Sequence, residues 1–179
     1  QKYEIIFKRM LFNLNEMLSV LCEDAAKKQF HNEADIKGLR NQIDRFALFC
    51  RRSISKGKYE GDAVIGWELL TFITHTAHLI DYVYTYMTKN KVPLKSRALE
   101  TLGELKGHIA LFTEASQRKD IALVQKILEK REEFLFNKTI SLLEHSEGKE
   151  AVVSSYVREL FRQVQIGASP LLSEILEAQ

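Results

Sequence analysis

The chain has 179 residues, of which 45% are hydrophobic and 28% are charged. This composition is ordinary for a folded globular protein and excludes a disordered segment. The 26 Lys and Arg residues nearly balance the 24 Asp and Glu residues, so the net charge of +2 gives no reason to expect nucleic acid, an anionic membrane or an acidic substrate as partner of the whole molecule. No apolar run approaches the roughly 18 residues of a membrane span, so we expect no membrane insertion.

The two cysteines, Cys22 and Cys50, show no metal-ligand spacing, and no signal peptide precedes them. They are typical of reduced, partly buried residues, which predicts a cytoplasmic protein. The chain starts without Met and already in a helical pattern, with no capping residue ahead of Tyr3 and Ile5. We therefore expect an N-terminal domain to be missing upstream.

Apolar residues recur at alternating three- and four-residue spacing, and no window shows the alternation of a half-buried strand. Only two Pro and eight Gly are present, which favours long helices. The pattern predicts six helices: residues 2–28, 33–56 and 62–89, a fourth with Pro93 in its first turn, a fifth capped by Asp120 and ending near residue 146, and a sixth that Pro170 kinks or ends.

Each predicted helix has one apolar stripe that we expect to be buried. The stripe of the third helix is sustained over its whole length, so this helix is the best candidate for a central packing helix. The predicted core residues are Met10, Leu14, Met17, Leu21, Ile36, Leu39, Ile43, Phe46, Cys50, Leu70, Ile73, Ala77, Ile80, Tyr84, Met87, Ala98, Leu102, Leu105, Ile109, Phe112, Ile121, Val124, Leu128, Leu135, Leu142, Val153, Tyr156, Leu160 and Val164.

A basic run formed by Arg51, Arg52, Lys56 and Lys58 surrounds Gly57. It falls at the end of the second predicted helix, where the last carbonyls leave partial negative charge. Aromatic residues do not interleave with the run. We therefore interpret it as a helix end rather than as a nucleic-acid patch.

The sequences of two predicted helices resemble those of a known protein family. Residues 9–17 read Arg-Met-Leu-Phe-Asn-Leu-Asn-Glu-Met, and residues 43–52 read Ile-Asp-Arg followed by an apolar run and two arginines. This resembles a PhoU-type domain of the archaeal kind, in which a basic residue precedes Met-Leu-x-Asn-Leu-x-x-Met and an acidic cluster precedes Val-Asp-Arg. The resemblance covers nearly the whole chain and implies an all-α fold of two tandem three-helix bundles, an up-down bundle repeat.

Positions about half a chain apart support an internal duplication. Asp44 corresponds to Glu132, 88 residues later, and His78 corresponds to Ala168, 90 residues later. We therefore expect a first three-helix bundle over residues 1–90 and a second over residues 91–179, joined in one compact unit.

In PhoU-like proteins the second and third helices of each bundle carry acidic motifs, which in several members hold clustered transition metals. These motifs are degenerate here. Asn41 and Gln42 replace the acidic residues ahead of Asp44, and His78 and Ala168 replace carboxylates on the third helices. Because a metal cluster needs several converging carboxylates, we expect no metal site and no cofactor.

Neighbouring charges strengthen this expectation. Lys37, Arg40 and Arg51 share a helix edge with Asp44, which predicts that they pair with the aspartate and repel a cation. The second bundle retains three acidic residues on its first motif helix, and we interpret them as a solvated helix face. They are Glu129, Glu132 and Glu133.

Three alternatives stay open. Thr74, His78 and Asp81 lie along one border of the third helix's stripe and could hold a single zinc ion, although a hydrogen-bonded histidine at the core edge is the favoured interpretation. A polar seam of His78, Asp81, Asp44 and Glu132 could make the protein a metal- or ligand-binding helical bundle. The chain could also be a helical adaptor that shares only the fold.

No Gly-rich phosphate loop, nucleophile elbow or Cys–His pair is found, so we expect no enzyme and name no catalytic residue. The resemblance implies a regulator of phosphate uptake or phosphate-responsive transcription that acts through protein contacts. Its partner would be a phosphate transporter subunit or a signalling protein such as a histidine kinase. DNA would be contacted only by the missing N-terminal domain, of the AbrB-like kind that archaeal relatives often carry. We also expect a homodimer, because long amphipathic bundles often leave an apolar groove for a second copy.

Overall fold

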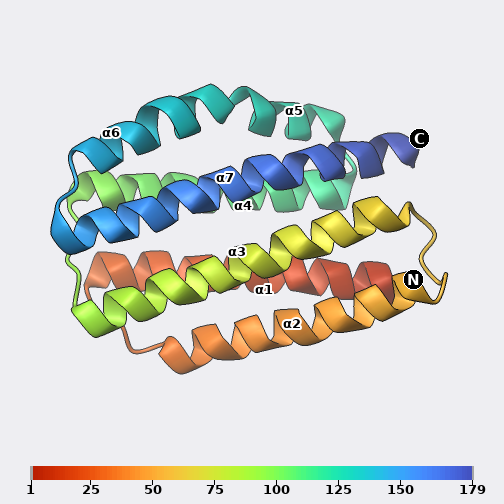
Figure 1. The fold of residues 1–179 in the computed structure, drawn as a ribbon, viewed down its shortest axis with the longest axis horizontal. Coiled ribbons are helices and arrows are strands. Elements are labelled where there is room, and N and C mark those ends of the chain that lie inside the picture. Colours follow the sequence, from red (N-terminus) through yellow and green to blue (C-terminus); the bar gives the residue numbers. More distant parts are fainter. Residues whose placement is uncertain (1, 179) are drawn as a thin grey trace.

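The computed structural model describes residues 2–178 and is all-α (Figure 1). The described residues contain no β-strand, which confirms the prediction of an all-α structure. Six helical segments follow one another, the fifth of which is divided into three parts. The elements are α1 (Lys2–Lys27), α2 (Glu33–Ser55), α3 (Ala63–Asn90), α4 (Ser96–Arg118), α5 (Ile121–Glu129), the π-helix η1 (Glu132–Lys138), α6 (Thr139–Glu144) and α7 (Gly148–Glu177).

Aspartate side chains fix the starts of two helices. The Asp62 carboxylate accepts hydrogen bonds from the backbone N–H groups of Val64 and Ile65 at 2.8 and 3.0 Å. The Asp120 carboxylate accepts one from the N–H of Ala122 at 2.9 Å. Each bond satisfies a donor that the first turn of a helix leaves unpaired. The predicted cap at Asp120 is thereby confirmed.

The helices lie side by side in an elongated bundle (Figure 1). α1, α2 and α3 contact one another, and so do α4, α7 and the segment formed by α5, η1 and α6. The two groups meet where α1 packs on α4 and α3 packs on α7. α2 and the α5–α6 segment therefore form opposite outer edges, and α1, α3, α4 and α7 lie between them (Figure 1).

One connected cluster of buried apolar side chains draws residues from every helix. All the predicted core residues are buried except five, which are partly buried and pack against the cluster. The periodicity of the sequence therefore predicted the core correctly. The five partly buried residues are Leu39, Phe46, Ile121, Leu128 and Tyr156.

The prediction that Pro93 lies in the first turn of the fourth helix is wrong, because α4 begins three residues later. Val92 and Leu94, on either side of the proline, are both buried in the core. The Glu150 carboxylate of α7 accepts a hydrogen bond from the backbone N–H of Lys95 at 3.1 Å. These contacts hold the segment around Pro93 outside the helix and place the helix start beyond it.

The fifth predicted helix is not one continuous α-helix. α5 ends at Glu129, and the chain then widens into the π-helix η1 before α6 begins. The hydroxyl of buried Thr139 donates to the carbonyl oxygen of Phe134 at 2.6 Å. The same carbonyl oxygen also accepts a hydrogen bond from the backbone N–H of Thr139, so both donors of this residue bind within the widened turn.

The sixth predicted helix, α7, does not end at Pro170 but continues to Glu177. A proline inside a helix removes one backbone hydrogen bond. α7 packs against α3, α4 and α5, so tertiary contacts hold the helix beyond the proline.

α3 contacts α1, α2 and α7 and carries the longest buried stripe, as predicted for a central packing helix. By length and composition alone it could also cross a membrane, since an 18-residue window reaches a mean hydropathy of 1.2. Half of that window is buried inside the fold. The central helix of a globular bundle meets the same criterion.

Candidate functional site

Asp44 on α2 and His78 on α3, which the sequence predicts to be degenerate metal-motif positions, form a polar pair. The Nε2 atom of His78 lies 3.0 Å from Oδ1 and 3.2 Å from Oδ2 of Asp44. About a third of each side chain is exposed to solvent. The favoured interpretation of His78 as a hydrogen-bonded histidine at the core edge is therefore confirmed.

Arg40 links this pair to a second carboxylate. Its Nη1 atom lies 3.5 Å from Oδ2 of Asp44, and its Nε atom lies 3.0 Å from Oδ2 of buried Asp81. The contact with Asp81 is an ion pair rather than a hydrogen bond, because the Nε–H group does not point at the carboxylate. Thr85 donates its hydroxyl to Asp81 at 3.4 Å. The chain's own groups thus neutralise both carboxylates.

The other two cations expected beside Asp44 have different partners. Lys37 forms an ion pair with Glu33 at 2.7 Å. The Arg51 guanidinium lies 5.2 Å from the centre of the Trp67 ring, a cation–π contact. Of the three predicted cations, Arg40 is the one that pairs with the aspartate.

A groove with a volume of about 690 Å³ adjoins this network between α2, α3 and α7. The hydroxyl of Thr74 reaches it but donates to the carbonyl oxygens of Leu70 and Thr71 within its own helix, at 2.9 and 3.0 Å. Thr74, His78 and Asp81 therefore have separate partners and do not form a ligand set. Over residues 2–178, no group of three or more His, Cys, Asp or Glu side chains is placed to hold a metal ion.

The fourth member of the predicted seam, Glu132, is not near the other three. It is exposed on η1, at the outer edge opposite α2 (Figure 1). Its neighbour Glu133 lies 2.6 Å from Lys130 and 3.0 Å from Lys138, and these two ammonium groups lower the pKa of the Glu133 carboxyl. Ala168, the predicted counterpart of His78 in the second half, is fully buried in the core. Glu129 and Glu132 are thus exposed and Glu133 is ion-paired, as predicted for a solvated helix face.

Sequence reasoning missed a buried histidine in the second half. His108 on α4 is 5% exposed and lies against the rings of Phe134 and Phe161. Its Nε2 atom is 3.3 Å from the side-chain nitrogen of Gln165. Burial, reinforced by the charge of Lys130, lowers the pKa of His108 to about 4, so the ring is neutral at pH 7. The available signal was its spacing of four residues from Phe112 on the predicted stripe.

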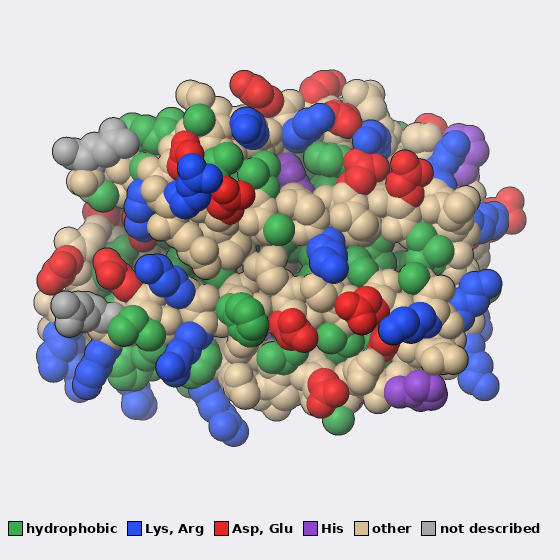
Figure 2. All heavy atoms as spheres, turned by 180° about the vertical axis from the view of Figure 1, so that it is seen from behind, with side chains coloured by type: hydrophobic (Ala, Val, Ile, Leu, Met, Phe, Trp, Pro, Cys, Tyr) green, Lys and Arg blue, Asp and Glu red, His purple; other side chains and the backbone are tan. Residues whose placement is uncertain are grey.

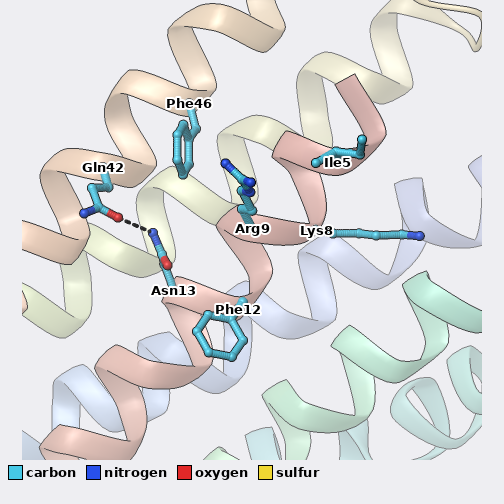
Figure 3. Close-up of a pocket in the computed structure, with 7 residues that line it drawn as sticks. All are labelled: Ile5, Lys8, Arg9, Phe12, Asn13, Gln42 and Phe46. Carbon is cyan, nitrogen blue, oxygen red and sulfur yellow. Dashed lines mark hydrogen bonds between the residues drawn. The ribbon is translucent and has the colours of Figure 1, made fainter. Parts of the chain in front are cut away.

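Sequence reasoning also missed a surface groove between α1 and α2, which we call the α1–α2 groove (Figure 3). It has a volume of about 440 Å³. Across its floor, the amide of Asn13 on α1 donates to the side-chain oxygen of Gln42 on α2 at 3.1 Å (Figure 3). The lining residues are Ile5, Lys8, Arg9, Phe12, Asn13, Gln42 and Phe46.

No protein-family model, no curated protein and no solved structure was found to match this chain.

Proposed function

We propose that this protein is a PhoU-like regulator that acts through protein contacts in the control of phosphate uptake or phosphate-responsive transcription. The proposal starts from the resemblance of residues 9–17 and 38–52 to the archaeal PhoU-type pattern. Its partner would be a phosphate transporter subunit or a signalling protein such as a histidine kinase. The homodimer and the cytoplasmic location stay predictions from the sequence.

The pairing of helices between the two halves is the observation that carries the proposal. The first helix of residues 1–90, α1, packs on α4, the first helix of residues 91–179 (Figure 1). The third helix, α3, packs on α7, which is third in the second half. The first helices of the two halves therefore pack on each other, and so do the third helices. This is the arrangement expected from duplication of a three-helix unit. This supports two tandem three-helix bundles sharing one core.

The partners of the two carboxylates support a structural role for Asp44 and Asp81 rather than metal binding or catalysis. Asp44 and Asp81 are already paired with Arg40, His78 and Thr85. A divalent ion would have to displace these partners before it gained a ligand, and it would meet the positive charge of Arg40. We therefore propose that these residues stabilise the contact between α2 and α3 and are not a metal or catalytic centre.

The test is an affinity capture from the source cells, grown with ample phosphate and without phosphate, with the full protein as bait. We expect a phosphate transporter subunit or a histidine kinase to be recovered, in amounts that change with phosphate supply. A bait carrying Arg131→Glu, a change on an exposed position of the second half, controls for the effect of bait charge. Recovery of neither class of protein in either medium would contradict the proposal.

A further inference from the structure

The α1–α2 groove opens onto a surface with exposed apolar side chains. Ile5 and Phe12 on α1 are 54% and 67% exposed, and Phe49 on α2 is 40% exposed. Seven residues separate Ile5 from Phe12, so they share one face of α1 about two turns apart. Phe46 of the groove and Phe49 are neighbours on α2 by their spacing of three residues. Large apolar side chains grouped on a surface mark a contact site.

The same surface carries cations without acidic partners. Lys8 and Arg9 on α1, and Arg45 and Arg52 on α2, are exposed. Over the described residues, none of the four takes part in an ion pair. Lys and Arg side chains gather at this end of the molecule, at the lower left of Figure 2, around hydrophobic ones. Glu16 continues the exposed face of α1 beyond Phe12, away from this end.

We infer that the α1–α2 groove binds an acidic amphipathic helix of a partner protein. Two packed helices leave between them a channel into which a third helix can place its apolar side chains. Apolar residues of that helix would pack on Phe12, Ile5 and Phe46, and its Asp and Glu residues would pair with Arg9 and Arg45. Charge complementarity of this kind gives specificity and speeds association.

The shape of the groove favours a helix over an anionic bilayer. Its lining includes two amides that are hydrogen-bonded to each other, that of Asn13, which is 8% exposed, and that of Gln42, which is exposed. Polar side chains of a bound helix can hydrogen-bond to these amides. Lipid acyl chains would instead have to cover these polar groups without replacing their hydrogen bonds, which is costly.

This inference rests on the proposed function for the identity of the partner as a regulatory target, but the binding itself does not depend on it. An acidic helix that binds while the lysate capture recovers no transporter subunit or kinase would overturn the proposed function alone. A phosphate-dependent capture that survives mutation of the groove would overturn the present inference alone.

The experiment is fluorescence anisotropy with a labelled helical peptide of about 20 residues, roughly 30 Å long. The peptide has Leu at helical three-and-four spacing and Glu at most other positions, and a matched peptide has Lys in place of Glu. The test variant carries Arg9→Glu and Phe12→Asp. The control variant carries Arg131→Glu and Phe136→Asp, the same two changes at exposed positions of the second half.

We expect saturable binding of the Glu peptide, no binding of the Lys peptide, at least about tenfold weaker binding by the groove variant, and no change in the control variant. Circular dichroism of both variants verifies that they are folded. Absence of binding, or equal binding by both variants, would overturn the inference. Binding to vesicles of phosphatidylserine and phosphatidylcholine without binding of the Glu peptide would also overturn it, in favour of a membrane surface.

Discussion

The two outer segments of the molecule occupy opposite edges but are held to their neighbours differently. α2 is one continuous helix, and a partly exposed hydrogen-bonded pair between Asp44 and His78 joins it to α3. The segment of α5, η1 and α6 is not one continuous helix, and aromatic side chains hold it to α7 and α4. Phe134 of η1 stacks on Phe161 of α7 with ring centroids 4.4 Å apart, beside buried His108 of α4. One edge thus relies on a partly exposed polar pair and the other on buried aromatic packing, and the second should contribute far more to stability.

The largest effect is expected from Phe161→Ala. Phe161 is fully buried and contacts both Phe134 and His108, so its loss leaves a cavity. We expect the free energy of unfolding to fall by about 3–5 kcal/mol, measured by urea denaturation. Phe136→Ala is the control, because Phe136 is 51% exposed on the same segment, and it should change the free energy by no more than about 0.5 kcal/mol. Similar losses for the two variants would contradict the aromatic account of this edge.

The next effect is a dependence of the free energy of unfolding on pH, caused by His108. Its pKa is lowered to about 4 in the folded protein, from an ordinary value of 6.5. Above pH 6.5 the ring is neutral in both states; as the pH falls from 6.5 to 4 the unfolded chain takes up a proton first, so the folded state loses stability. The loss should be on the order of 3 kcal/mol.

Urea denaturation at a series of pH values, with His108→Gln as comparison, measures this contribution. Carboxylates titrate in both proteins, so the difference between the two curves isolates the histidine. We expect the variant to lose less stability than the wild type between pH 6.5 and 4. Parallel curves would show that burial of His108 does not affect its protonation.

A smaller effect on stability is expected from substitutions at the contact between α3 and α7, which belong to different halves of the chain. A Cβ atom at Gly167 on α7 would lie 2.7 Å from ring atoms of Phe72 on α3, and that ring also packs on Phe112. Gly167→Ala should therefore destabilise the protein by about 1–3 kcal/mol. Gly107→Ala on α4, where a Cβ meets nothing within 4 Å, should instead stabilise it by about 0.5–1 kcal/mol. Thermal melting of both variants checks the opposite signs; equal shifts would argue against close packing of α3 on α7.

The smallest effect is expected from Asp44→Asn. A polar pair whose partners are about one-third exposed is worth about 0–1 kcal/mol, so the melting temperature should barely change. Addition of zinc or manganese should not stabilise the wild type, because the Asp44 carboxylate already interacts with Arg40 and His78. A metal-dependent rise in melting temperature that disappears in Asp44→Asn would instead support the metal-binding alternative.

Local patterns in the sequence were sufficient to predict the helices and the core. Apolar spacing identified the buried stripes, and short-range chemistry identified the cap at Asp120. The start of α4 was missed because it depends on Glu150, a residue 55 positions from its partner Lys95. The π-helix was also missed, since helical periodicity does not distinguish one extra residue in a turn from a regular turn.

The candidate sites were harder to predict because they combine distant helices. The pairing of Asp44 with Arg40 follows from a spacing of four residues, whereas its contact with His78 depends on how α2 packs on α3. The α1–α2 groove was overlooked because its aromatic residues come from two helices. Along α2 alone the basic run has no interleaved aromatics, but the fold places the Trp67 ring of α3 against Arg51 of this run.

We propose that the protein regulates phosphate uptake through protein contacts made at the α1–α2 groove. The most direct test measures uptake of labelled phosphate by source cells that lack the gene, in phosphate-rich and phosphate-poor media. We expect the deletion to alter the response of uptake to phosphate, and the wild-type protein and the Arg131→Glu, Phe136→Asp control to restore it. The Arg9→Glu, Phe12→Asp variant should be folded but fail to restore it. An uptake response that is the same with and without the gene would contradict the claim.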